Sequence, residues 1–403
     1  MSAATIPSAA QLKLPDATFN RYRTIAIVAL VIGLGLVGAG FGTAHETFAR
    51  DASFSYLVAF VFWLTIALGG LGFVLIQFLT RAGWSVVVRR IAESVASTLP
   101  AFLVLFVPII FALHQLYPWT DAKYLEEHVA VAAKHGWLNE TFFLIRAAVY
   151  LLVWTFLSRR MLKLSVNQDY SGDANVTGRL QAVSPVGMLV FALTLTFAAF
   201  DWIMSLQPAW YSTIFGVYIF TGAMLSIHAF LSIMSVCLRR LPGMDQVISI
   251  EHNHALGKFL FGFTVFWAYI GFSQFFLIWY SNIPEETIFY KARFVPGWVN
   301  GSWGLLFGQF VLQFFIMLPR EAKRVPAWLT FGAFWALTFH LVDLYWLIMP
   351  NRDPEGIRIT LTDVGSFLAV GGIFFFLFLR QLRGEALIPL RDPRLDESLA
   401  MEN

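Results

Sequence analysis

Two ionisable side chains lie inside one strongly apolar stretch of the chain, residues 184–230. Asp201 and His228 belong to two long apolar runs that only residues 207–210 separate, which predicts a helical hairpin that crosses a bilayer and returns. A carboxylate at mid-membrane costs about 2.5–3.5 kcal/mol on insertion scales, so a chain that keeps one generally has a partner or a use for it. Both residues are therefore candidates for proton transfer.

Further polar residues recur in other apolar runs, and their depths can be compared at about 1.5 Å per helical residue. Asp201 is expected roughly 9 Å below the outer face, with Asp343 and Gln274 at about the same depth. His340 and Gln309 are expected near the midplane. The polar residues therefore form a ladder across the outer half of the membrane.

The inner half is expected to hold His228, about 26 Å from the outer face, with Ser232 on the same helical stripe. The gap of roughly 17 Å between Asp201 and His228 is too long for a direct proton hop and would need water. We therefore predict an outer and an inner part of a proton path, bridged by His340. The candidate path residues are Asp201, His228, His340, Asp343, Arg146, Gln274, Gln309, Ser205 and Ser232.

Each of these residues also has a purely structural interpretation. Polar side chains in membranes hydrogen-bond neighbouring helices, which is the simpler role for single glutamines and serines. Arg146 either extends to the interface or neutralises a buried carboxylate at its own depth. If Asp201 carries protons, Asp201→Asn should reduce proton translocation without preventing assembly.

The elements that must position these residues are membrane helices. Apolar residues make up 58% of the 403 and charged residues 13%, against about 45–50% and about 25% in soluble domains. Alternation typical of a barrel is missing, so we expect an all-α integral membrane protein. Ten runs are long enough to span a bilayer, at about 24–44, 56–80, 95–117, 141–163, 182–206, 211–237, 257–281, 298–319, 326–349 and 361–383.

The basic residues predict the orientation of these helices. Twenty of the 28 Lys and Arg residues fall in the termini and loops of one side, which places both termini in the cytoplasm by the positive-inside rule. We expect a cytoplasmic segment at 1–23, a polytopic membrane domain at 24–383 and a cytoplasmic tail at 384–403. Residues 1–20 show no removable signal peptide. The net charge of +3 orients the chain and does not indicate nucleic acid.

The single cysteine, Cys237, leaves no CxxCH haem attachment and no cysteine-ligated iron–sulfur cluster within this chain. His252 and His254 form an HxH pair without a further ligand at metal-binding spacing. We therefore expect no bound metal and no catalytic residue, and any redox centre would belong to partner subunits.

Two long segments carry a family resemblance. Residues 198–223 read AAFDWIMSLQPAWYSTIFGVYIFTGA, and residues 254–287 read HALGKFLFGFTVFWAYIGFSQFFLIWYSNIPEET. They resemble the ActF subunit of bacterial alternative complex III, a quinol:electron-acceptor oxidoreductase, and are similar to ActC and the NrfD and polysulfide reductase membrane subunits. Within them, Phe200-Asp201-Trp202 matches the family's FDW motif.

The resemblance implies about ten transmembrane helices, arranged as two four-helix bundles plus two flanking helices, in the bacterial inner membrane. It implies no cofactor bound by this chain, with quinol or menaquinol as substrate of the complex. The implied partners are an ActC-like membrane subunit and periplasmic subunits that carry iron–sulfur clusters and haem c. The chain would then be a subunit without redox centres that provides a proton path and a quinone-interacting surface. We take Asp201 and His340 as the candidates for that surface, His340 from its expected depth alone.

Two other functions remain open at this stage. A proton-coupled secondary transporter would also need buried carboxylates, although no internal repeat of the kind common in transporters is visible. A cytochrome b-like haem anchor needs pairs of histidines at matching depth, whereas His228 and His340 are expected at different depths.

Overall fold

The computed structural model describes residues 12–43 and 47–402. These ranges contain ten helices long and apolar enough to cross a membrane and no β-strand, which confirms the all-α integral membrane fold. The helices of membrane length are α1 (Asp16–Thr43), α2 (Phe48–Leu79), the broken rod α3–α5 (Val86–Ala96, Ala101–Leu105, Val107–Phe111), α9 (Glu140–Ser171), α10 (Asn175–Trp202), α11 (Phe215–Leu238), α12 (Ile250–Ser281), the rod α14–η4–α15 (Pro296–Gly304, Leu305–Leu312, Gln313–Met317), α17 (Pro326–Ile348) and α18 (Leu361–Gly384).

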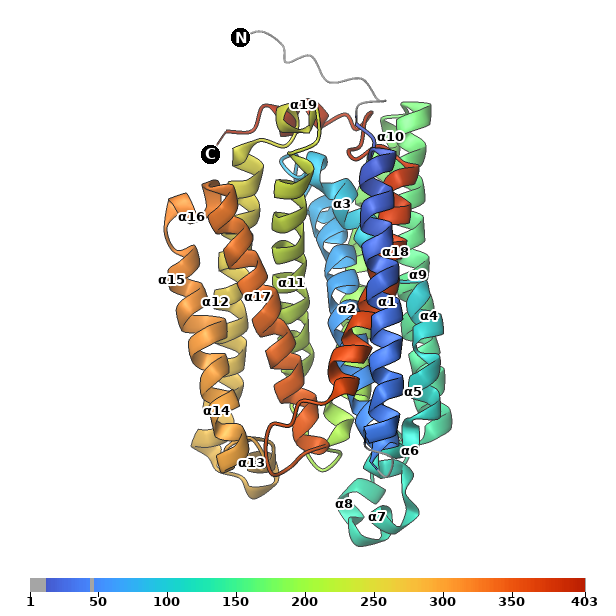
Figure 1. Cartoon of the computed structure of the whole chain (residues 1–403), viewed down its shortest axis with the longest axis vertical. Coiled ribbons are helices and arrows are strands. Elements are labelled where there is room, and N and C mark those ends of the chain that lie inside the picture. Colours follow the sequence, from blue (N-terminus) through green and yellow to red (C-terminus); the bar gives the residue numbers. More distant parts are fainter. Residues whose placement is uncertain (1–11, 44–46, 403) are drawn as a thin grey trace.

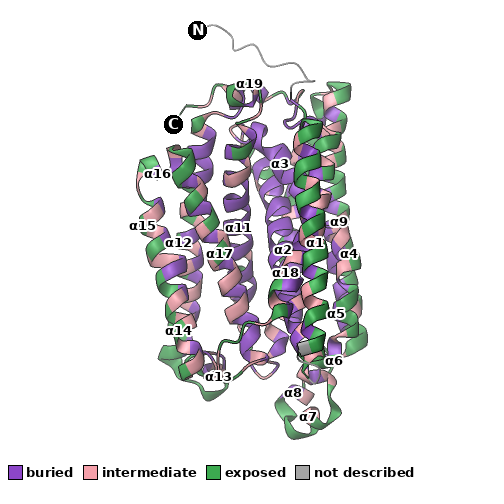
Figure 2. Cartoon of the chain, viewed as in Figure 1, coloured by how far each residue is buried: buried purple, intermediate pink, exposed green. Residues whose placement is uncertain are grey.

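The helices pack as two groups of four with a flanking pair (Figure 1). The first bundle consists of α2, the α3–α5 rod, α9 and α10, and the second of α11, α12, the α14–α15 rod and α17. α1 and α18 lie side by side against α2. Helices α2 and α11 join the two bundles and are the most buried, whereas α1 is largely exposed (Figure 2). The first and last described residues, Leu12 and Glu402, lie at one end of the molecule, called here the termini end (Figure 1).

The flanking pair is held by close backbone contact. A Cβ atom added to Gly33 of α1 would lie 2.6 Å from the Gly365 carbonyl oxygen of α18, and one added to Gly372 would lie 2.6 Å from the Ala26 carbonyl oxygen. Only glycine permits helices to approach this closely. α1 begins at Asp16, earlier than residue 24, because its first turns are polar and apolar runs alone do not reveal them. Of the expected segment 1–23, residues 1–11 lie outside the described part.

The third span also starts earlier than the expected residue 95, at Val86. The added turns carry Arg89, Arg90 and Glu93, which are all buried. Both arginines lie within 3.2 Å of the Glu93 carboxylate, and Arg90 also contacts Asp169 of α9 at 2.8 Å. Charged residues at the edge of an apolar run were expected in a loop, but pairing allows the helix to include them.

Local irregularities shape the second bundle. The segment η4 is a π-helix of eight residues, flanked by α-helical turns in the same rod. Its Gln309 is completely buried, and the Gly308 carbonyl accepts a hydrogen bond from the Trp335 indole of α17 at 2.8 Å. π-helical segments are rare and concentrate at functional sites.

The tail expected at 384–403 is docked on the termini end and contains the short helix α19 (Leu395–Leu399). Its Leu387 amide donates to the Leu12 carbonyl at 2.8 Å, and its Asp392 carboxylate contacts Arg89 at 2.6 Å. The opposite end carries three short helices, α7 (Ala122–Glu127), α8 (Val129–Ala132) and α13 (Pro284–Lys291).

Candidate functional site

Asp201 lies in the first bundle and is fully buried. Arg146 of α9 pairs with it through two hydrogen bonds, Nε to Oδ2 at 2.7 Å and Nη2 to Oδ1 at 2.8 Å. The Tyr150 hydroxyl donates to Oδ2 at 2.8 Å and the Trp137 indole to Oδ1 at 3.0 Å. The carboxylate therefore accepts four hydrogen bonds, two of them from Arg146, and Arg146 neutralises it instead of extending to the interface.

This arrangement is typical of a structural ion pair. The Arg146 guanidinium also donates to the Trp137 carbonyl at 2.9 Å and stacks over the Trp137 and Phe142 rings at 4.1 and 4.3 Å. Ser205 hydrogen-bonds the backbone carbonyl of Asp201, not its carboxylate. A carboxylate whose two oxygens both accept from a bidentate arginine and from further fixed donors fits a structural role better than proton transfer.

Asp343 lies in the second bundle and has a different environment. It is 1% exposed, and its carboxylate accepts hydrogen bonds from the Tyr218 hydroxyl of α11 and from the Trp267 indole of α12, the latter at 3.0 Å. Among the residues that the structure describes, no Lys, Arg or His forms an ion pair with it. A buried carboxylate with two neutral donors and no cation can exist protonated or charged, which is the property a proton carrier needs.

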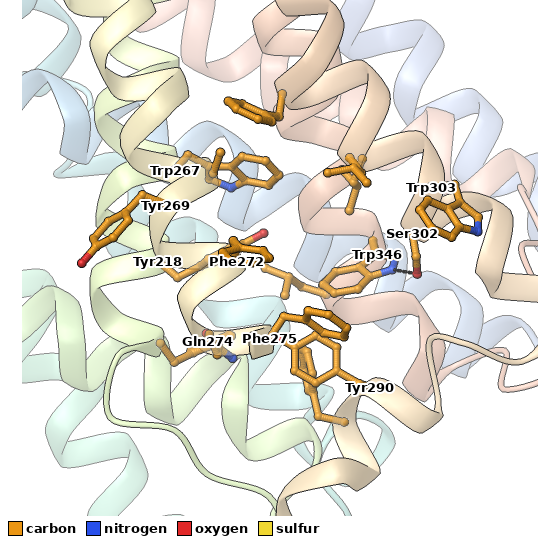
Figure 3. A pocket seen from close by; sticks show the side chains of 18 of the residues that line it. Tyr218, Trp267, Tyr269, Phe272, Gln274, Phe275, Tyr290, Ser302, Trp303 and Trp346 are labelled. Atoms are coloured by element: carbon orange, nitrogen blue, oxygen red, sulfur yellow. Dashed lines mark hydrogen bonds between the residues drawn. The ribbon is translucent and has the colours of Figure 1, made fainter. Parts of the chain in front are cut away.

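Tyr218 and Trp267 also line a large aromatic pocket (Figure 3). The pocket has a volume of about 620 Å³ and lies between α11, α12, α13, α14, η4 and α17. Its walls are largely apolar, and the polar exceptions include Gln274, Ser302 and the hydroxyl groups of the lining tyrosines Tyr218, Tyr269 and Tyr290. The two donors to Asp343 therefore separate this carboxylate from a space large enough for a ring-containing ligand.

Arg293 lies behind the pocket wall and was counted from the sequence only as an outer-loop charge. It is fully buried and donates to three backbone carbonyls and to the Gln207 side chain, with its guanidinium 3.4 Å from the Phe289 ring centroid. No carboxylate pairs with it in the described part of the chain. Burial lowers the pKa of Arg293 to about 9.

His340 lies one helical turn from Asp343, where the two bundles meet. Its Nε2 atom is 2.9 Å from the Thr65 hydroxyl of α2, and its ring packs against Phe62 and over Gly222 of α11. Its Nδ1 atom is buried without a protein partner within the described ranges. Polar atoms of this kind are the ones that ordered water satisfies.

Gln309 also has buried polar atoms without a protein partner in the described part of the chain. Both polar atoms of its side chain are buried and have no hydrogen-bond partner among the described residues. Gln274 lies on the wall of the aromatic pocket, as Figure 3 shows. The second bundle thus contains Asp343, His340, Gln309 and Gln274, while Asp201 and Arg146 belong to the first. The expected outer group is split between two bundles.

The inner candidates are enclosed by the protein core. The His228 Nδ1 atom is 2.6 Å from the Met224 carbonyl, and the ring lies between Phe73, Phe259 and Phe263. The Ser232 hydroxyl donates to the His228 carbonyl of the same helix at 2.7 Å, a local bond of the structural type.

The HxH pair has a structural explanation in part. His252 Nδ1 accepts from the Ser249 amide at 3.0 Å in a capping box at the start of α12. Within residues 12–43 and 47–402, no group of three His, Cys, Asp or Glu side chains is placed to hold a metal ion. No family model matches this chain, and no curated protein matches it.

Proposed function

We propose that this chain is a membrane subunit of a quinol:electron-acceptor oxidoreductase and provides a proton path through its second bundle. The observation that carries the proposal is Asp343, a buried carboxylate without a cation whose two donors form the wall of the aromatic pocket. Oxidation of a quinol releases two protons, so a protonatable group beside a ring-sized apolar pocket is suited to receive them. The resemblance of residues 198–223 and 254–287 to alternative complex III subunits supports the same function.

The path would use the groups that the second bundle brings together. Asp343 and His340 are adjacent on one face of α17, and Gln309 and His340 offer polar atoms that water can bridge. We leave Asp201 out of this path because it forms an ion pair with Arg146. Neither Asp201 nor His340 lines the aromatic pocket, so we assign the quinone-interacting surface to Tyr218, Gln274 and Tyr290 instead.

The remaining parts of the proposal follow the resemblance. The chain would lie in a bacterial inner membrane with both termini in the cytoplasm, beside an ActC-like subunit and below periplasmic iron–sulfur and haem c subunits. Those partners would hold all redox centres, and this chain would contribute only protein side chains and water to proton transfer.

Asp343→Asn in the assembled complex tests the function. The amide keeps the size of the carboxylate but cannot ionise; its oxygen can still accept from the Trp267 indole, while its NH₂ group can donate to the Tyr218 hydroxyl oxygen. We expect quinol-driven proton release in proteoliposomes to fall by roughly two orders of magnitude, the lower end of what a positioned proton-transfer group contributes. The exposed Asp245→Asn serves as control, and co-purification of the haem c subunit verifies assembly.

Wild-type proton release and quinol turnover in an assembled Asp343→Asn complex would contradict the proposal. Proton-coupled solute uptake by the isolated chain in liposomes, without added quinol, would instead support the secondary transporter that the sequence left open.

A further inference from the structure

A second large pocket lies toward the termini end, whereas the aromatic pocket lies toward the opposite end, near α13. This pocket, which we call the flanking groove, has a volume of about 610 Å³ and lies between α1, α11 and α18. On α18 its lining extends from Phe367 to Leu382, about 22 Å at 1.5 Å per residue. The groove therefore has the length of a lipid chain with its headgroup, since half of a bilayer's hydrocarbon core is about 15 Å thick.

The polar residues of the flanking groove are concentrated at one end. Thr18 and Arg21 lie in the first turns of α1, and Arg240 follows the last turn of α11. Both arginines are exposed, and no carboxylate pairs with either of them among residues 12–43 and 47–402. By contrast, Arg383 of the neighbouring α18 pairs with Asp16 at 3.0 Å. Two guanidinium groups without an acidic partner thus border the mouth of the groove.

The deep end of the flanking groove offers no free hydrogen-bonding group. Its lining there consists of Trp63, Phe367 and Leu368, and the Trp63 indole already donates to the Phe367 carbonyl at 3.1 Å. A quinone ring, which needs hydrogen bonds at its carbonyl oxygens, has no partner in this region. A hydrocarbon chain needs none and would bury its surface against these side chains.

We propose that the flanking groove binds an anionic phospholipid, with its phosphate between Arg21 and Arg240 and an acyl chain along α18. Basic side chains at the cytoplasmic ends of membrane helices bind acidic headgroups, and arginine is suited to phosphate because it donates in a fork. The bound lipid would fill the space between α1 and α11 and hold the flanking pair against the second bundle.

Cys237 provides a direct readout of this site. It lines the groove, is exposed and is the only cysteine of the chain, so the unmodified protein can be labelled there with a maleimide. We expect phosphatidylglycerol added to the delipidated full chain in detergent to slow Cys237 alkylation, and phosphatidylcholine at the same concentration to have little effect. Native mass spectrometry should show phosphatidylglycerol retained on the protein.

The double variant R21Q/R240Q should weaken phosphatidylglycerol binding about 30-fold, because each basic side chain near an acidic headgroup contributes about 1 kcal/mol. R159Q/R380Q is the matched control, since these two exposed arginines lie outside the groove. Ala29→Phe, which fills the groove without removing charge, should abolish protection of Cys237.

Three outcomes would overturn the proposal: equal protection by phosphatidylcholine, equal weakening in the control pair, or unchanged protection in Ala29→Phe. The thermal unfolding of every variant, measured in detergent, separates loss of binding from loss of folding. This test requires no quinol and no partner subunit, so its failure is independent of the proposed proton path.

Discussion

Two buried carboxylates of this protein differ in the charge of their neighbours. Asp201 accepts two hydrogen bonds from Arg146, whereas Asp343 accepts one each from Tyr218 and Trp267. The first is an ion pair and the second is a carboxyl group with neutral partners. The same residue type is therefore structural in one bundle and a candidate proton carrier in the other.

Asp201→Asn should act mainly on stability. Removing the negative charge leaves the buried Arg146 guanidinium unpaired, which costs about 3–5 kcal/mol in comparable cases. Unfolding of the purified chain by heat or by sodium dodecyl sulfate measures this loss. The apolar pair Arg146→Met with Asp201→Leu should recover part of it.

The sequence alone favoured another result for Asp201→Asn, namely reduced proton translocation in a stable complex. That result would show that the ion pair opens during turnover and would return Asp201 to the proton path.

At the scale of elements, the contact between α1 and α18 depends on glycine. A Cβ atom at Gly33 would meet the backbone of α18, while one at Gly35 meets nothing within 4 Å. Gly33→Val should therefore destabilise the protein by about 1–3 kcal/mol through overpacking, and Gly35→Val, two residues away on the same helix, by much less. Thermal unfolding in detergent checks both, and equal effects would mean that valine acts on α1 itself.

The helices could be predicted from the sequence much better than the partners of individual residues. Apolar runs revealed all ten spans because composition decides membrane insertion. The hydrogen-bond partners of Asp343 could not be predicted from the sequence, because Tyr218 and Trp267 lie far from it along the chain. Aromatic residues in apolar runs are also common, and most of them face lipid or pack in the core. Arg89 and Arg90 precede the apolar run that predicted the third span, so they were expected in a loop. Their burial could not be predicted because it depends on acidic residues of other elements.

The orientation of the whole molecule across the membrane can be tested. The first and last described residues lie at one end, and the basic residues predict that this end faces the cytoplasm. A fluorescent protein fused after residue 403 should therefore be fluorescent, and alkaline phosphatase at the same position inactive. The opposite pattern would show that the protein has the reverse orientation in the membrane and would place the flanking groove in the outer leaflet.

The docking of the tail on α3 has a consequence for biogenesis. The Leu390 amide donates to Asp169 at 2.7 Å and Asp392 contacts Arg89, so a segment synthesised after α18 completes a charge network that begins in the third span. Among the described residues, Arg89 otherwise pairs only with Glu93, and Arg90 shares that carboxylate. The network is thus complete only after α18 has been synthesised, and a stop codon directly after Gly384 would leave the third span inserted but without its contacts to the tail.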